Sequence, residues 1–268
     1  MPLQTLLACL VFLFAWNLRA DPIRILFLGH ESEHHNSNEY YPMLAKALGR
    51  DAIYFDYLTS VKQALDDEEY LNRFDGLLLY ANHPKLTAVQ WKNLLGFVRG
   101  GKGFVPVHCA SWCFSNIPEY DQLVGGRFKS HQGAVFSPRI VAEGHPAVSG
   151  VDKLEAWDET YFHTRHNPKD RTVLMVRDAM PGDPHEKPEP WTWVRTEGKG
   201  RVFYTASGHD ERVWSKPEFH QLLKQGILWA VGDQVRERYD GFLANRVPLE
   251  YEKRCLLYTS DAADDRMR

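Results

Sequence analysis

Short apolar runs alternate with amphipathic stretches along the first part of the chain. The apolar runs have the length of buried strands, and we expect strands at Ile23–Leu28, Ile53–Leu58, Gly76–Tyr80 and Gly103–Val107. The stretches between them have apolar residues at helical spacing, which predicts helices at Glu39–Leu48, Val61–Arg73 and from Thr87 to Val98. Strands that alternate with helices are typical of parallel βαβ units, so the pattern predicts an α/β fold with a mostly parallel sheet.

The pattern changes after Ser111, where the apolar runs are shorter and turn residues are more frequent. Pro, Gly and Asp residues between Met180 and Pro190 predict a loop. No internal repeat and no clear linker is visible, so residues 21–250 are expected to form one domain. Its later elements are predicted as strands at Ala134–Ala142, Val173–Val176, Trp191–Arg195 and Gly200–Thr205, followed by a helix at Pro217–Val231.

The two ends of the chain depart from this pattern. Leu6–Trp16 is an apolar run too short to span a bilayer, and Ala20 offers a small residue before a cleavage point. Residues 1–20 are therefore predicted to be a signal peptide, which implies a periplasmic or secreted protein; a short buried segment is the alternative. Residues 251–268 lack periodicity, and from about Cys255 they resemble translated adapter sequence rather than native protein.

Charge and composition narrow the classes of partner. The net charge of −3 argues against binding to nucleic acid or to an anionic membrane surface. Because the longest apolar run is short, we do not expect an integral membrane protein. The hydrophobic fraction of 44% in 268 residues is enough for a substantial core.

Several of the 12 histidines follow predicted strands directly. His30, His108 and His209 each come after a strand of the predicted parallel sheet, and the carboxyl ends of such strands meet at one edge. Asp158 and Glu159 add carboxylates. Histidine and carboxylate together can bind a divalent metal such as zinc, for which His108, Glu159 and His209 are the candidate ligands. The same groups can act as general acid and base without a metal.

Cys109 lies at the end of the fourth predicted strand, where a nucleophile could be placed. The neighbouring residues do not form the Gly-x-Cys-x-Gly context of an amidotransferase nucleophile, although His209 could serve as its base. The four cysteines form neither a disulfide framework nor a Cys-x-x-Cys pair.

A series of short motifs occurs in one order between Ile23 and Gly232. The motifs are Gly29-His30, Val107-His108-Cys109-Ala110, Gly125-Gly126-Arg127-Phe128 with His131, His145-Pro146, Asp158-Glu159-x-Tyr161, Gly198-Lys199-Gly200-Arg201-Val202-Phe203-Tyr204 and Gly208-His209. In combination they resemble the trehalose-utilisation ThuA-like family. The resemblance implies a flavodoxin-like fold like that of class I glutamine amidotransferases, with helices on both faces of the sheet. It also implies a role in carbohydrate metabolism, often beside oxidoreductases that make 3-keto sugars.

The favoured function is an exported enzyme, a hydrolase, lyase or isomerase, that acts on a sugar or 3-keto-sugar glycoside. The expected ligand is a small-molecule carbohydrate, a sugar oxidoreductase is a candidate partner, and a homo-oligomer stays open. We expect catalytic roles for His108, Glu159, His209 and Asp158. The expected substrate-binding residues are His30, Glu31, His35, His131, Tyr161, Asp210, Arg212 and Trp214.

Two alternatives belong to other classes. The first is a non-catalytic carbohydrate-binding accessory domain, which would not need the histidines and would use the aromatic residues Trp112, Trp157, Tyr161, Trp191 and Trp214. The second is a Cys-dependent hydrolase or amidotransferase-like enzyme with Cys109 as its nucleophile.

Overall fold

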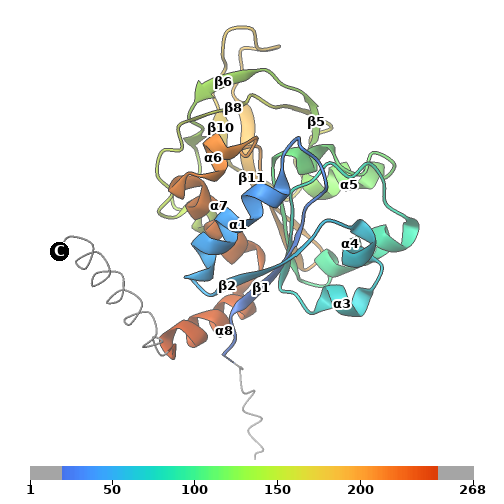
Figure 1. Cartoon of the computed structure of the whole chain (residues 1–268). Coiled ribbons are helices and arrows are strands. Elements are labelled where there is room, and N and C mark those ends of the chain that lie inside the picture. The colour runs from blue at the N-terminus through green and yellow to red at the C-terminus, as the bar shows by residue number, and fades with distance from the viewer. Residues whose placement is uncertain (1–19, 247–268) are drawn as a thin grey trace, which may run out of the picture.

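A computed structural model describes residues 20–246 of the chain, and an eight-stranded sheet forms its centre (Figure 1). Along the sheet the strands follow the order β2 (Ile53–Leu58), β1 (Ile23–Leu28), β3 (Gly76–Leu79), β4 (Gly103–Pro106), β12 (Gly200–Thr205), β11 (Glu189–Glu197), β10 (Arg171–Arg177) and β7 (Arg139–Ile140). The first five are parallel, whereas β11, β10 and β7 pair antiparallel with their neighbours. The parallel part has the flavodoxin-like order.

Helices cover both faces of this sheet (Figure 1). The helices within the described residues are α1 (Ser37–Gly49), α2 (Val61–Leu65), α3 (Glu68–Asn72), α4 (Ala88–Arg99), α5 (Pro118–Val124), α6 (Glu211–Trp214), α7 (Pro217–Ala230) and α8 (Asp233–Ala244), with 3-10 turns η1 (His108–Trp112) and η2 (Pro146–Val148). One layer contains α1 and α7, and the other contains α3, α4 and α5. The predicted α/β fold is confirmed.

Two predicted elements are wrong in detail. The helix predicted at Val61–Arg73 is two helices, because the Asp67 carboxylate accepts bonds from the backbone N–H groups of Glu69 and Tyr70 and so caps α3. The strand predicted at Ala134–Ala142 is also divided. Pro138 lacks a backbone N–H group, so the ladder is interrupted there.

Two small antiparallel sheets lie outside the central one. In the first, β5 (Arg127–Ser130) pairs with β9 (Phe162–Thr164), and in the second, β6 (Gly133–Phe136) pairs with β8 (Ala156–Glu159). We did not predict β8 and β9, because they are too short to show a periodic pattern. The helices α5 and α8 were also not predicted. The β6–β8 sheet ends at Glu159, one of the residues that the sequence analysis names as a candidate ligand.

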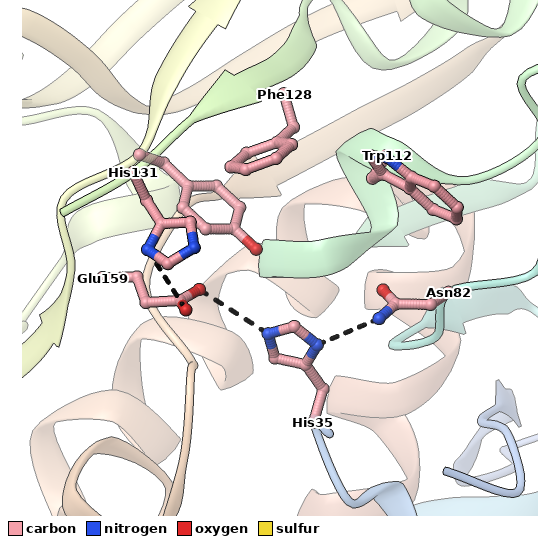
Figure 2. A pocket seen from close by; sticks show the side chains of 7 residues that line it. His35, Asn82, Trp112, Phe128, His131 and Glu159 are labelled. Carbon is pink, nitrogen blue, oxygen red and sulfur yellow. Dashed lines mark hydrogen bonds and ion pairs between the residues drawn. The ribbon is translucent and has the colours of Figure 1, made fainter. Parts of the chain in front are cut away.

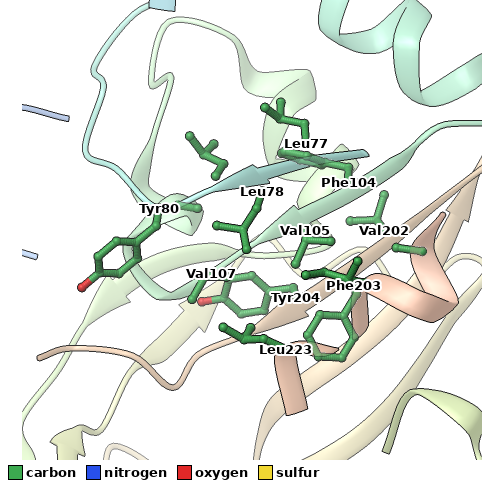
Figure 3. Packing of buried hydrophobic residues seen from close by; sticks show 14 of the residues in the cluster. Leu77, Leu78, Tyr80, Phe104, Val105, Val107, Val202, Phe203, Tyr204 and Leu223 are labelled. Atoms are coloured by element: carbon green, nitrogen blue, oxygen red, sulfur yellow. The ribbon is translucent and has the colours of Figure 1, made fainter. Parts of the chain in front are cut away.

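The core forms around the central strands (Figure 3). Leu77 of β3, Val105 of β4 and Phe203 of β12 are buried, as is Leu223 of α7. Parallel strands with both faces covered are apolar along their whole length, which explains why these strands were recognised in the sequence. At Gly226 an added Cβ would lie 2.6 Å from the Phe203 ring, so glycine permits α7 to approach the sheet closely.

No helix within residues 20–246 is long and apolar enough to cross a membrane. The predicted signal peptide, apart from Ala20, and the predicted non-native tail lie outside the described residues. The proposed boundaries of the domain at residues 21 and 250 stay predictions.

Candidate functional site

The carboxyl ends of the parallel strands supply one group of polar side chains. His30 follows β1, Asn82 follows β3, His108 follows β4 and His209 follows β12. Because these strands are parallel, the four residues lie at the same edge of the sheet. Glu159, at the end of β8, reaches this edge from the small β6–β8 sheet.

Three imidazoles surround one carboxylate oxygen of Glu159. Its Oε2 atom lies 3.2 Å from Nε2 of His108, 3.2 Å from Nδ1 of His209 and 3.7 Å from Nε2 of His35. One ligand atom from each of the four residues falls within 4.8 Å of the others. The three candidate ligands named from the sequence, His108, Glu159 and His209, therefore lie together, and His35 joins the set as a fourth member.

The protonation of His108 follows from its surroundings. Its Nδ1 atom lies 2.6 Å from the backbone carbonyl of Ala206, which can only accept, so we assign the ring proton to Nδ1. Burial lowers the pKa of His108 to about 3, which keeps the ring neutral. Nε2 is then an unprotonated nitrogen that faces the Glu159 carboxylate. Two acceptors at this distance repel each other unless a cation lies between them.

The other two imidazoles also present nitrogens without a hydrogen bond. His35 Nε2 and His209 Nδ1 are buried and find no hydrogen-bond partner among the described residues. Burial lowers the pKa of His35, which favours the neutral ring. Burial also lowers the pKa of His209, but contact with Glu159 raises it more, so the net pKa is above its usual value. A buried nitrogen without a hydrogen bond costs free energy, which a metal ion would relieve at His35. At His209 a metal ion would replace the proton that contact with Glu159 favours.

Buried hydrogen bonds fix the orientation of His35. The second ring nitrogen of His35 lies 3.1 Å from the side-chain amide of Asn82. Nε2 of His30 lies 2.9 Å from the His35 carbonyl, and Nδ1 of His30 accepts the backbone N–H group of Asn82. His30 therefore holds the loop that carries His35 and does not itself reach Glu159.

Asp158 is next to Glu159 in sequence but has a different environment. Its carboxylate accepts backbone N–H groups from Glu159, Gly208 and His209 at 2.8 to 3.1 Å. Burial raises the pKa of Asp158 to about 7, against the lowering effect of these bonds. The carboxylate holds the turn at Gly208, where φ is +131°, and thereby places His209.

A pocket of about 300 Å³ opens beside Glu159 (Figure 2). His131 lies at its side with Nδ1 3.3 Å from the other carboxylate oxygen of Glu159, Oε1. The Tyr161 ring stacks on the His108 ring at 4.1 Å between centroids. The residues that line the pocket are His35, Asn82, Trp112, Phe128, His131, Glu159 and Tyr161.

Five of the predicted substrate-binding residues do not line this pocket: His30, which instead holds the loop of His35, and the four described next. Glu31 is exposed and accepts a hydrogen bond from Thr59. Asp210 caps α6 and pairs with Arg212, whose guanidinium lies 3.7 Å from the centre of the Trp157 ring. Trp214 is buried in the core, where its indole N–H donates to the Gly208 carbonyl, so it cannot touch a ligand in the pocket.

The Cys109 thiol is also inaccessible. It is buried, and burial raises its pKa well above the usual value, so the thiolate form needed for nucleophilic attack is disfavoured. This geometry supports the histidine and carboxylate set over the Cys-dependent alternative.

Sequence reasoning missed Asn82 as a site residue. The available signal was its position, since it is the first polar residue after the third parallel strand, as His30 and His108 are after theirs. Phe128 was noticed only as part of a motif, and Trp112 only under the accessory-domain alternative. Neither was expected beside Glu159.

Comparison with known proteins places the chain in a family. A profile of the family described as trehalose utilisation, ThuA, matches residues 24–230. ThuA-like proteins from Bacteroides uniformis and Parabacteroides merdae each have a TM-score of 0.66 and 19% identity; the matches cover 81% and 86% of this chain and 94% of each of theirs. A β-galactosidase from Rahnella has a TM-score of 0.52 and 16% identity, over 77% of this chain and 31% of that one.

These structural likenesses show the fold alone. Comparison with curated protein sequences gives no match. The family match spans both the parallel sheet and the residues that surround Glu159. This chain belongs to the ThuA family of trehalose utilisation.

Proposed function

We propose that this protein is a metal-dependent enzyme of carbohydrate metabolism, with a divalent ion such as zinc held by His35, His108, Glu159 and His209. The observation that carries the proposal is the group of three imidazole nitrogens around Glu159 Oε2. Two of them lack a hydrogen-bond partner among residues 20–246, and the third is assigned as unprotonated. Three nitrogens and one carboxylate oxygen are a donor set that zinc accepts.

The surrounding residues support each proposed ligand. The Ala206 carbonyl fixes the tautomer of His108, as an outer partner does for metal-binding histidines. The Asn82 amide can be flipped so that its oxygen, rather than its nitrogen, faces Nδ1 of His35. The oxygen would then accept the Nδ1 proton and leave Nε2 of His35 unprotonated, as the Ala206 carbonyl does for His108. Asp158 holds the backbone of His209.

The pocket beside this set is where we place the substrate. A bound divalent ion would polarise a carbonyl or hydroxyl oxygen of the substrate or activate a water molecule. His131 contacts the outer oxygen of Glu159 and its ring is 43% exposed, so it can reach a ligand in the pocket. Family membership supports a sugar as the substrate, and within this proposal it is a sugar or 3-keto-sugar glycoside that undergoes hydrolysis, elimination or isomerisation.

Metal titration tests the proposal directly. Protein treated with a chelator should bind one zinc ion in calorimetry, and His209→Ala should weaken binding at least about 100-fold, more than the loss of an outer partner costs. His166→Ala is the matched control, because His166 is a partly exposed histidine near a different glutamate. Turnover of a 3-keto disaccharide should require the ion. Equal zinc affinity in wild type and His209→Ala would contradict the proposal.

A further inference from the structure

The number of ligands in the Glu159 set is larger than a catalytic zinc ion normally has. A zinc ion with four protein ligands has a complete tetrahedral shell, which is the arrangement of structural sites. Catalytic sites usually have three protein ligands and leave one position for the substrate or for water. The set contains four residues whose ligand atoms lie within 4.8 Å of one another: His35, His108, Glu159 and His209. For catalysis at this set, one of the four has to leave its position.

The position of the pocket indicates which of the four residues this is (Figure 2). Of the four, His35 and Glu159 line the pocket of about 300 Å³, whereas His108 and His209 do not. Glu159 is the centre of the set, because all three imidazoles face its Oε2 atom. A molecule that enters the pocket therefore reaches the set on the side of His35.

His35 is also the most distant of the three imidazoles from the carboxylate. Its Nε2 atom lies 3.7 Å from Oε2 of Glu159, whereas the facing nitrogens of His108 and His209 both lie 3.2 Å from that oxygen. His35 belongs to the loop between β1 and α1. The hydrogen bond to its ring involves Asn82, which itself lines the pocket. A ligand in the pocket can therefore act on the His35 ring and on its hydrogen-bond partner together.

The other two imidazoles are held by groups that do not line the pocket. His108 is fully buried, and its Nδ1 atom lies 2.6 Å from the backbone carbonyl of Ala206. The backbone N–H group of His209 donates to the Asp158 carboxylate at 3.1 Å. The carbonyl of His209 accepts the hydroxyl of Tyr80, also at 3.1 Å, and Tyr80 is fully buried. These two imidazoles are therefore placed to keep their positions when the pocket is filled.

We propose that His35 is an exchangeable ligand of this metal centre. It completes the set while the pocket is empty and leaves its position when an oxygen ligand enters the pocket, whereas His108, Glu159 and His209 stay. The inference rests on the proposed function and adds to it the residue that opens the site. Nε2 of His30 lies 2.9 Å from the His35 carbonyl and holds the backbone there, so we expect the side chain alone to move.

Cobalt(II) in place of zinc tests this inference, because its NMR and visible spectra report the ligands. The probe is acetohydroxamate, a small anion that binds divalent ions through two oxygen atoms. In the cobalt-loaded wild type, one paramagnetically shifted imidazole N–H resonance should be absent from His35→Ala. Acetohydroxamate should abolish the shift of that resonance, and the visible spectra of the wild type and His35→Ala should then coincide. His34→Ala is the matched control, because His34 is the exposed neighbour in the same loop, and it should behave as the wild type.

Zinc titration of the same variants provides a second measurement. His35→Ala should still bind one zinc ion, with an affinity reduced about tenfold, the smaller end of the cost of an outer partner, against at least about 100-fold for His209→Ala.

Three results would overturn the exchange of His35. They are an equal loss of zinc affinity in His35→Ala and His209→Ala, a His35 resonance that is missing at the start or keeps its shift with acetohydroxamate, and a cobalt spectrum that acetohydroxamate does not change. In each case a wild type that binds the metal leaves the proposed function standing. A wild type that binds neither zinc nor cobalt refutes the proposed function and this inference with it.

Discussion

Among the described residues two glutamates are surrounded by histidines, four at Glu159 and three at Glu189, and of these two sets only the one at Glu159 brings four possible metal ligands within 4.8 Å of one another. The second set is centred on Glu189, which is buried. Its Oε1 lies 3.2 Å from Nδ1 of His163 and 3.9 Å from Nε2 of His166, and its Oε2 lies 3.4 Å from Nε2 of His185. In residue types and in distances it resembles the set around Glu159.

The difference lies in where the protons are. In the Glu189 set, Nδ1 of His163 donates to the carboxylate and Nε2 is hydrogen-bonded to the Tyr204 hydroxyl at 2.9 Å, so both ring nitrogens are used. The His163 backbone N–H also donates to Glu189. In the Glu159 set, His35 and His209 each leave one buried nitrogen without a hydrogen-bond partner among the described residues. The hydrogen-bond partners of the ring nitrogens, rather than the residue types, therefore distinguish the candidate metal centre from the structural network.

The largest effect is expected for Glu159→Gln. Zinc affinity should fall at least about 100-fold, beyond the cost of losing an outer partner, because the ligand loses its charge. The metal-free protein should keep its stability, since a glutamine N–H group can donate to His108 Nε2. Thermal unfolding with and without zinc measures both, and the wild type alone should be stabilised by the metal. If zinc raised the unfolding temperature of the variant as much as that of the wild type, Glu159 would not be a metal ligand.

The matching substitution in the other set, Glu189→Gln, should have the opposite result. We expect a loss of roughly 2 kcal/mol in the free energy of unfolding, because bonds from His163 to a charged acceptor are weakened. Zinc stoichiometry and affinity should stay at wild-type values. Denaturant unfolding and zinc titration of the same preparation provide the comparison. Loss of zinc binding in this variant would show that the two sets are not independent.

The Glu189 set also predicts how stability depends on pH. Burial lowers the pKa of His163 below 6.5, and contact with His163 lowers that of Glu189 below 4.5 despite its burial. Both pKa values are lower in the folded state than in the unfolded state, so the unfolded state binds more protons than the folded state as the pH falls. Stability should decrease below about pH 6.5 for His163 and further below about pH 4.5 for Glu189.

Thermal unfolding between pH 8 and pH 4, in the presence of a chelator, measures this dependence. His163→Gln serves as the control, because it removes the group that titrates first. Its unfolding temperature should vary less than that of the wild type between pH 7 and pH 5. Parallel curves for the two proteins would exclude His163 as the source.

A smaller effect is expected for Tyr204→Phe, which removes the hydroxyl that links the two regions. This hydroxyl lies 2.9 Å from Nε2 of His163 and 3.1 Å from the carbonyl of His108, a residue with φ of +48°. The loss of one buried hydrogen bond should cost about 1 kcal/mol of stability. Zinc affinity should fall by less than about tenfold, the lower range for an outer partner. A larger drop in zinc affinity, measured by calorimetry, would show that the Tyr204 hydroxyl is needed to position the metal ligands.

The sequence by itself determined the parallel half of the sheet and the edge at which the site lies. Strands buried on both faces are apolar throughout, so their bounds were readable, and parallel strands place the residues that follow them at one edge. His108 and His209 could be paired on that basis. Glu159 was identified from its neighbours and a family resemblance, and its distance from both histidines agrees with that choice.

Only the tertiary structure decided which side chains face one another. His30 lies two residues after the end of β1, yet it is His35 that reaches Glu159, because His30 bonds to the loop that carries His35. Trp112 and Trp214 are equivalent as residue types, but one is exposed at the pocket and the other is buried in the core. The direction of a side chain depends on packing between segments far apart in the chain. No local pattern contains that information, and the same is true of the protons that distinguish Glu159 from Glu189.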